Sequence, residues 1–384
     1  MIAFVINKAA KSLLRLLSDR SLDQAFDRLP KFTLPAKEDK ATSENIQTVR
    51  VCALQSEIKI HADLRSLITA IDAQLSAAVG QGAALVCFPE FYGLTLCGLS
   101  KEVRLMLSLL GEREKKQNVS KEKSTAYNSG GSNVDLPKLI GGLGFLQERY
   151  AALMARFARR YGVYVSCGTI ISVENGKLYN RHILIGPDGR LLGQADKLHL
   201  TKEEHLLGLS QGEQLSVVTT EIGNIALLVC MDATYFESFR IAKRLGADYA
   251  IVPIGDMAAF DPWLALRGVQ VRANETGLAI IKPALVSAPG FPIRFTGRAG
   301  IWFPLESAFS SVEAVSWDTQ GFVTADLDLA ALRDFSNHGA HAEPGAHTEH
   351  AAKERLFNRS NPDFDKNYAE AITQSTIIGQ QAGK

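Results

Sequence analysis

The sequence predicts an α/β fold, specifically a four-layer αββα sandwich of two mixed sheets. Short apolar runs rich in valine, isoleucine and leucine alternate with longer segments whose apolar residues recur at helical spacing. The resulting order is β-α-β-α-β-β-β-β-α-β-α-β. Such an order is typical of two sheets that each carry helices on the outer face.

The individual elements follow from this periodicity. The apolar runs predict strands at 49–54, 83–88, 163–168, 216–220, 225–230, 249–253 and 278–282. A hairpin is expected over 179–192, because Pro187-Asp188-Gly189 presets the dihedral angles of a tight turn. The helical spacing predicts helices at about 8–29, 60–80, 146–160, 235–245 and 261–276.

The chain divides into three parts. Residues 1–46 are predicted to be an N-terminal helical extension and linker, and residues 47–335 the main domain. A polar insertion at about 101–140 interrupts that domain directly after an early strand, where it is placed to cover the mouth of a pocket. Residues 336–384 form a polar C-terminal tail with a possible dimer-interface segment.

Both ends of the chain allow a second interpretation. The basic residues Lys8, Lys11 and Arg15 could belong to an organellar presequence, but an amphipathic helix that docks on the body is the preferred prediction. The tail contains four histidines that could bind a metal, but no cysteine or carboxylate spacing supports a tetrahedral set. A surface loop is therefore preferred for these histidines, which are His338, His341, His347 and His350.

The composition is that of an ordinary soluble globular protein. Of the 384 residues, 46% are hydrophobic and 22% charged, and the net charge of +1 gives no reason to expect a nucleic acid or an anionic membrane as partner. No apolar run reaches the roughly 18 residues that a membrane span needs. The five cysteines are odd in number and lack a C-x-x-C pair, so we expect no disulfide framework, no metal, no cofactor and a cytoplasmic location.

Three reactive side chains stand at the ends of predicted strands. Cys230 ends one apolar run at a strand-to-helix turn, Glu90 follows another run and a proline, and Lys197 stands where a third strand enters a loop. In α/β sheets reactive groups gather where strands end. A carboxylate could take the thiol proton, and an ammonium could stabilise the oxyanion of a tetrahedral intermediate.

At this point the chain resembles the nitrilase superfamily, the carbon–nitrogen hydrolases, over residues 49–335. The resemblance rests on four motifs in the family's order. They are Phe88-Pro89-Glu90, the stretch from Tyr179-Asn180 to Lys197-Leu198-His199-Leu200, Cys230-Met231-Asp232 with Glu237, and Val271-Arg272-Ala273-Asn274-Glu275. Two departures, Ala284 and Gly297-Arg298-Ala299, concern the pocket rim and core packing.

The resemblance implies a role for each site residue. Glu90, Lys197 and Cys230 would form the catalytic triad, with the Met231 backbone N–H as a second oxyanion donor. The family's additional glutamate is assigned to Glu204, with Glu203 as the alternative. Tyr92 and Asp256 are candidate substrate-binding residues, although a surface acid is an equally good interpretation of Asp256.

The resemblance also implies a substrate class and an assembly. Met231-Asp232 after the cysteine resembles the amidase-like branches, so an amide or carbamoyl substrate is preferred, cleaved through a thioester on Cys230. Nitrile hydrolysis, acyl transfer by the same triad and a catalytically silent scaffold remain alternatives. Family members form dimers, so a homodimer or higher homo-oligomer is expected, with the stretch 357–368 resembling an interface segment.

Overall fold

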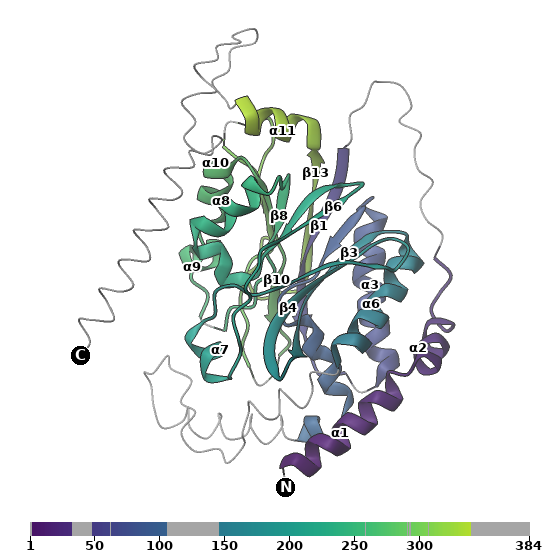
Figure 1. The fold of residues 1–384 in the computed structure, drawn as a ribbon. Helices are drawn as coiled ribbons and strands as arrows, with labels where there is room; N and C mark the ends of the chain where they lie inside the picture. The colour runs from purple at the N-terminus through teal and green to yellow at the C-terminus, as the bar shows by residue number, and fades with distance from the viewer. Residues whose placement is uncertain are drawn as a thin grey trace, which may run out of the picture.

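Two β-sheets lie face to face, and helices cover the outer side of each (Figure 1). The structure is a computed structural model that describes residues 2–32, 48–61, 63–105, 146–257, 259–289, 291, 293–305 and 307–338. This arrangement confirms the predicted αββα sandwich of two mixed sheets.

The first sheet contains seven strands. Its order is β10-β1-β2-β3-β4-β5, and β13 pairs with β1 outside this path. The pairs β10–β1, β1–β2 and β2–β3 are parallel, whereas β3–β4, β4–β5 and β1–β13 are antiparallel. The bounds are β1 (Thr48–Ile58), β2 (Leu85–Cys87), β3 (Tyr164–Glu174), β4 (Lys177–Ile185), β5 (Leu191–Asp196), β10 (Ala284–Ser287) and β13 (Gly321–Asp328).

The second sheet contains six strands in the order β12-β11-β9-β8-β7-β6. Its central strands β7, β8 and β9 are parallel, and the outer strands pair with their neighbours in antiparallel fashion. The bounds are β6 (Ser216–Thr220), β7 (Gly223–Leu227), β8 (Tyr249–Ile251), β9 (Ala279–Lys282), β11 (Gly300–Trp302) and β12 (Val312–Glu313).

Helices on both outer faces complete the four layers. On the first sheet they are α3 (Leu64–Gly80) and α6 (Leu146–Tyr161), and on the second α8 (Phe236–Arg244) and α10 (Val269–Thr276), with α9 (Pro262–Leu266) beside them (Figure 1). Shorter elements follow three of the strands: η1 (Tyr92–Leu99), α7 (Lys202–Leu206) and η2 (Cys230–Thr234). The helix α11 (Leu329–His338) follows β13.

The alternation of side chains along β1 shows how the layers are held. Val51 and Ala53 face the core between the two sheets, whereas Cys52 and Leu54 face the core under the helices. All four are buried. Because successive side chains of a strand point to opposite faces, one strand contributes to two apolar layers at once.

The N-terminal extension docks on the body, but the prediction of one helix over residues 8–29 is wrong. The structure has α1 (Ile2–Leu16) and α2 (Asp19–Phe26), separated at Ser18, whose side chain accepts a hydrogen bond from the backbone N–H of Ser21. A serine in this position caps a new helix and ends the previous one. Leu13 and Leu22 are fully buried in the core under α3 and α6.

The helix predicted over residues 261–276 is also divided. Arg267 and Gly268 adopt positive φ angles of 45° and 70° between α9 and α10. Two consecutive left-handed residues cannot continue a right-handed helix. The break turns the chain, and it matters for the position of Arg267 described below.

The shortest of the chain's crossings between the two sheets is at Pro283. Lys282 ends β9 in the second sheet, and Ala284 begins β10 in the first. The residue Ile254, which follows β8, donates to the Pro283 carbonyl at 2.9 Å and accepts from the Leu285 N–H at 2.9 Å. The chain therefore changes sheets at one proline, which is hydrogen-bonded to the end of a neighbouring strand.

Several sequence-based predictions fall outside the described residues. These are the insertion from residue 106 onward, the tail histidines His341, His347 and His350, and the interface segment 357–368. Within the described part of the chain, no helix combines the length and the apolar character needed to cross a membrane. The same part contains no group of three or more side chains that could hold a metal ion.

Candidate active site

Glu90 and Lys197 meet in the interior at the ends of two strands of the first sheet. Glu90 stands three residues beyond β2, and Lys197 directly follows β5. The Lys197 Nζ donates to Glu90 Oε1 at 2.9 Å. Their exposed fractions are 1% and 0%, so this ion pair is shielded from water.

Two further side chains complete the polar cluster. Glu204, on α7, accepts from Lys197 Nζ at 2.9 Å through Oε1 and lies 2.8 Å from it through Oε2. The Asn180 amide, on β4, donates to Glu90 Oε1 at 2.8 Å and to Glu204 Oε1 at 3.0 Å. A buried ammonium with two carboxylates and a bridging amide forms a connected network, which low dielectric strengthens.

The position of Glu204 follows from a local capping motif. Thr201 precedes α7, and its hydroxyl accepts from the Glu204 N–H at 3.2 Å. In return, Glu204 Oε2 accepts from the Thr201 N–H at 2.9 Å. This reciprocal pair is a capping box, which fixes the glutamate at the first turn of the helix. Glu203, the alternative considered from the sequence, is exposed.

The loop that holds Glu90 depends on a glycine in the neighbouring strand. Gly168, on β3, has a φ of +65°, and a Cβ added there would lie 1.9 Å from the Pro89 carbonyl oxygen. The Phe91 N–H also donates to the Thr169 hydroxyl at 2.8 Å. Only glycine permits this close approach, so β3 shapes the turn that delivers Glu90.

Cys230 is delivered by the second sheet. It follows β7 by three residues, starts η2 and has a φ of 43°. Its N–H donates to the Pro253 carbonyl at 3.0 Å, which fixes the turn against the segment after β8. A cysteine with positive φ at a sharp strand-to-helix turn has the geometry of a nucleophile elbow.

Asp232 connects the cysteine turn to the lysine loop. Its Oδ1 accepts from the N–H groups of Leu198 and His199 at 3.1 and 2.8 Å, and lies 3.0 Å from His199 Nδ1. Its Oδ2 accepts from the Val229 N–H at 2.9 Å. One buried carboxylate therefore joins the backbone before Cys230 to the backbone after Lys197.

Burial sets the electrostatics of the cluster. Burial raises the pKa of Glu90, with Lys197 opposing the shift and Glu204 reinforcing it. Burial and the Glu90 carboxylate raise the pKa of the Cys230 thiol, against the lowering effect of Lys197 and Arg267. For Lys197, burial lowers the pKa, but Glu90, Cys230 and Glu204 together raise it above its ordinary value. The lysine stays charged, and Glu90 is a stronger base than an exposed carboxylate.

Glu90 keeps one oxygen available. Although the Cys230 thiol acts on the pKa of Glu90, the Oε2 atom has no hydrogen-bond partner of ordinary geometry among the described residues. A Cβ added at Gly255 would lie 3.3 Å from this oxygen. Gly255 therefore leaves room beside the atom that a proton-transfer step would use.

The other sequence-predicted residues have separate positions. Met231 follows Cys230 at the start of η2 and is half-buried. Asp256 is buried, paired with Arg267, and acts electrostatically on Cys230. Tyr92 is not brought to the cluster: its hydroxyl accepts from the Gln74 amide at 2.9 Å in the core under α3. Tyr92 therefore lies apart from the cluster, in the apolar core.

Sequence reasoning did not assign a role to Asn180 or Arg267. Asn180 stood within the quoted lysine motif, and its position on a strand beside Lys197 was a usable signal. Arg267 stood within a predicted helix. The only sequence signal was the following Gly268, since a glycine inside a helical pattern can mark a break.

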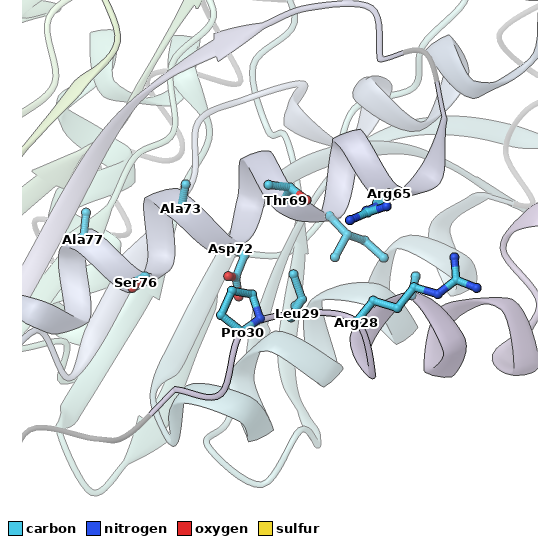
Figure 2. Close-up of a pocket in the computed structure, with 11 residues that line it drawn as sticks. Arg28, Leu29, Pro30, Arg65, Thr69, Asp72, Ala73, Ser76 and Ala77 are labelled. Carbon is cyan, nitrogen blue, oxygen red and sulfur yellow. The ribbon is translucent and has the colours of Figure 1, made fainter.

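A separate hollow of about 540 Å³ lies between the end of α2 and α3 (Figure 2). Arg28 and Arg65 lie at one end of it, and Ser76 and Ala77 at the other. Its acidic residue, Asp72, is already paired with Arg160 at 3.0 Å and with the Tyr161 hydroxyl at 2.7 Å. The hollow therefore offers no reactive set comparable to the cluster around Cys230.

Comparison with known proteins places the chain in one family. A family model described as carbon-nitrogen hydrolase matches residues 48–337. A probable hydrolase of Bacillus subtilis is 27% identical over 74% of this chain, which spans about half (51%) of that relative's length. An omega-amidase of Danio rerio is 27% identical over 54% of this chain and 80% of its own length.

Solved structures show the same fold. A cysteine-to-alanine mutant of the amidase from Nesterenkonia sp. AN1, in complex with butyramide, has a TM-score of 0.55 at 19% identity and covers 74% of this chain and 93% of its own. A glutamate-to-glutamine mutant of that amidase has a TM-score of 0.55 at 18% identity, over 76% and 95% of the two chains. It shows covalent addition of the acetamide moiety of fluoroacetamide at its active-site cysteine.

Proposed function

The chain belongs to the carbon–nitrogen hydrolase family, and we propose that it hydrolyses the C–N bond of an amide or carbamoyl substrate through a thioester on Cys230. One observation carries the proposal: the buried Lys197 ammonium lies 2.9 Å from Glu90 Oε1, and both groups act electrostatically on the Cys230 thiol. Base, cation and nucleophile come from three strand ends and together supply the groups that thiol catalysis uses.

Acylation is the first half of the proposed reaction. Glu90 takes the thiol proton, and the Cys230 thiolate attacks the carbonyl carbon. Lys197 and the Met231 N–H hold the oxyanion of the tetrahedral intermediate. Glu90 then gives its proton to the leaving nitrogen, the C–N bond breaks, and ammonia or an amine departs. The acyl group stays on sulfur.

Hydrolysis of the thioester is the second half. Glu90 takes a proton from a water molecule, whose oxygen attacks the thioester carbonyl carbon. The C–S bond breaks, the carboxylic acid leaves, and the proton returns to the Cys230 sulfur. Glu204 and Asn180 keep Lys197 and Glu90 in position during both halves of the reaction. Neither of them contacts a reacting atom.

Two observations support an amide rather than a nitrile, and a third concerns the role of Asp232. Met231-Asp232 stands after the cysteine, where the sequence resemblance favours the amidase-like branches. Known proteins similar to this chain include an omega-amidase, which is similar in sequence, and an amidase of similar fold seen with butyramide. Asp232 is committed to four contacts with backbone and His199, so it serves the turn rather than the substrate.

The test is to trap the thioester. The protein is mixed with amides, carbamoyl compounds and nitriles, and both ammonia release and the mass added to Cys230 are measured. We expect Cys230→Ala to abolish turnover and Glu90→Gln to slow acylation, whereas Cys97→Ala, a buried cysteine on η1, keeps turnover. Turnover by Cys230→Ala, or undiminished acylation by Glu90→Gln, would contradict the proposed mechanism. No adduct and no ammonia across the panel would favour a silent scaffold.

A homodimer is part of the proposal. Exposed apolar side chains occur on the helices outside the second sheet: Leu245, the residue after α8, is 55% exposed, Trp263 on α9 80% and Val271 on α10 52%. Burying such a face against a second copy removes apolar surface from water. Light scattering should give a dimer mass that falls to a monomer mass in Trp263→Glu/Val271→Glu. A monomeric wild type would contradict this proposal.

We also propose a cytoplasmic location. All five cysteines are free and buried, and Cys230 must be a reduced thiol to act. A reducing compartment meets both conditions. Fractionation of the source cells with an antibody against the chain tests this, and recovery in an oxidising compartment would contradict it.

A further inference from the structure

Beside the nucleophile lies a pair of charged side chains that the proposed mechanism does not use. Asp256 follows β8, and Arg267 lies between α9 and α10. Their side chains are only 7% and 8% exposed and form an ion pair through Asp256 Oδ1 and Arg267 Nη2. Arg267 Nη1 also lies 3.7 Å from the sulfur of Met231, the residue next to Cys230.

The pair is close enough to Cys230 to act on its chemistry. Burial is the largest influence on the pKa of the Cys230 thiol, but Arg267 lowers that pKa and Asp256 raises it. Interactions of this kind fall off with distance. Together with the 3.7 Å contact between Arg267 Nη1 and the Met231 sulfur, this influence places both charges next to the nucleophile, within reach of a substrate whose reacting carbon lies at Cys230.

Each member of the pair has one polar atom without a partner. Arg267 Nε and Asp256 Oδ2 are buried and make no hydrogen bond with any described residue. A buried polar group without a partner has lost its hydrogen bonds to water and gained none in return, so native proteins rarely keep one without a reason. The two unpartnered atoms differ in kind, since Arg267 Nε is a donor on a cation and Asp256 Oδ2 is an acceptor on the neighbouring anion.

The backbone also groups Arg267 with the catalytic residues. Four described non-glycine residues have positive φ, and three of them are Cys230, Phe91 next to Glu90, and Arg267. A left-handed backbone is strained for a residue that carries a side chain, and such strain clusters at functional sites. The buried Lys282 ammonium donates to the Ala265 carbonyl, which holds the end of α9 two residues before Arg267.

We propose that Arg267 and Asp256 form a subsite for the far end of the substrate, and that this end is an α-amino acid head. The carboxylate would bind the Arg267 guanidinium, and the ammonium would bind Asp256. Such a head satisfies both unpartnered atoms at once. An amide with only a carboxylate leaves Asp256 Oδ2 unpartnered, and an uncharged amide leaves both. This inference rests on the proposed amide hydrolysis at Cys230.

Four amides that share a four-carbon butanamide unit test the subsite. Glutamine carries both charged groups, glutaramate lacks the ammonium, 4-aminobutanamide lacks the carboxylate, and butyramide lacks both. We expect kcat/KM for ammonia release to be highest for glutamine and lowest for butyramide. Asparagine and its analogues are measured in the same way, because one methylene changes the span between the amide carbon and the head.

Single variants separate the two charges. Arg267→Gln is expected to lower kcat/KM by about 10- to 100-fold for glutamine and glutaramate, the range for one charge-assisted hydrogen bond. Asp256→Asn is expected to do the same for glutamine and 4-aminobutanamide. Because both charges also act on the Cys230 thiol, butyramide turnover reports the change at the nucleophile itself, and the loss for each charged amide is measured relative to butyramide. The double variant Arg267→Gln/Asp256→Asn removes both charges, so it leaves no buried unpaired charge that could by itself unfold the protein.

A matched control removes a neighbouring cation. Arg272, on α10, is paired with Glu275 at 2.6 Å, so Arg272→Gln should leave the ranking of the four amides unchanged. Equal losses for all four amides in the Arg267 and Asp256 variants would assign the pair a structural role and overturn the subsite. So would a wild type that prefers butyramide or glutaramate. If no amide gives ammonia or an adduct on Cys230, the proposed function itself has failed.

Discussion

His182 joins the two sheets, and its protonation is predicted to weaken the fold at mildly acidic pH. It lies fully buried on β4, with Nε2 2.7 Å from the Ser166 hydroxyl and Nδ1 3.0 Å from the Leu228 carbonyl oxygen. Because a carbonyl oxygen only accepts, Nδ1 carries the proton and Nε2 accepts from Ser166. The neutral ring therefore links the first sheet to the backbone just before Cys230.

The size of the effect follows from the pKa. Burial lowers the pKa of His182 from 6.5 to about 4. As the pH falls below 6.5, the unfolded chain binds a proton that the folded chain refuses, so stability is lost between that pH and about 4. From about pH 7.5 to about pH 5, linkage gives a loss of about 2 kcal/mol in the free energy of unfolding.

The assay compares urea unfolding of the wild type and His182→Gln at these two pH values. We expect the wild type to lose about 2 kcal/mol more than the variant on acidification. The comparison cancels His61, whose pKa burial also lowers to about 4. His205→Gln, an exposed position on α7, should lose as much as the wild type. Equal losses in wild type and His182→Gln, or an NMR titration of His182 near 6.5, would refute the reasoning.

Three further substitutions test the packing at the site and at the N-terminal helices. Gly168→Ala should lower the free energy of unfolding by more than about 3 kcal/mol, because a collision with the backbone adds to the strain of a positive φ. Gly176→Ala, where φ is also positive but the space is open, should cost about 1 kcal/mol, and equal costs in thermal or urea unfolding would contradict the collision. Asp232→Asn should lower the free energy of unfolding by about 2 kcal/mol and also lower kcat, since one carboxylate fixes both loops; a change in neither would contradict that role. Leu13→Ala should lower the free energy of unfolding by about 2–5 kcal/mol and Arg156→Ala by less than about 1 kcal/mol, because buried apolar side chains rather than partly exposed ion pairs hold the N-terminal helices. A larger loss in Arg156→Ala than in Leu13→Ala would contradict this.

The main layers could be predicted from the sequence because their periodicity is local. The runs around Cys52 and Cys87 and the helix from Leu64 to Gly80 each carry their own pattern. The break at Ser18 was also readable, since serine is a preferred N-cap. In contrast, β13 pairs with β1 across more than 250 residues, and its alternation alone does not reveal that partner.

The candidate site shows the same division. Glu90, Lys197 and Cys230 were predicted because each ends an apolar run, and strand ends of a sheet converge. Asn180 contacts Glu90 and Glu204, which lie 90 and 24 residues away in the sequence, so no local pattern predicts these contacts. Arg267 reaches Asp256 only because the chain leaves helical geometry at that residue, and a helical pattern predicts the opposite.

The single proline between β9 and β10 has a consequence for how this protein can change over evolutionary time. Glu90 and Lys197 follow strands of one sheet, and Cys230 and Asp256 follow strands of the other, so the spacing between the proposed base and the proposed nucleophile is a spacing between sheets. That spacing is set by the side chains that fill the central layer, including Leu227, Ile251 and Ile281. With the sheets held together at Pro283, a methylene gained or lost in this layer moves one half of the chemistry against the other. Residues that never meet the substrate can thus adjust its turnover.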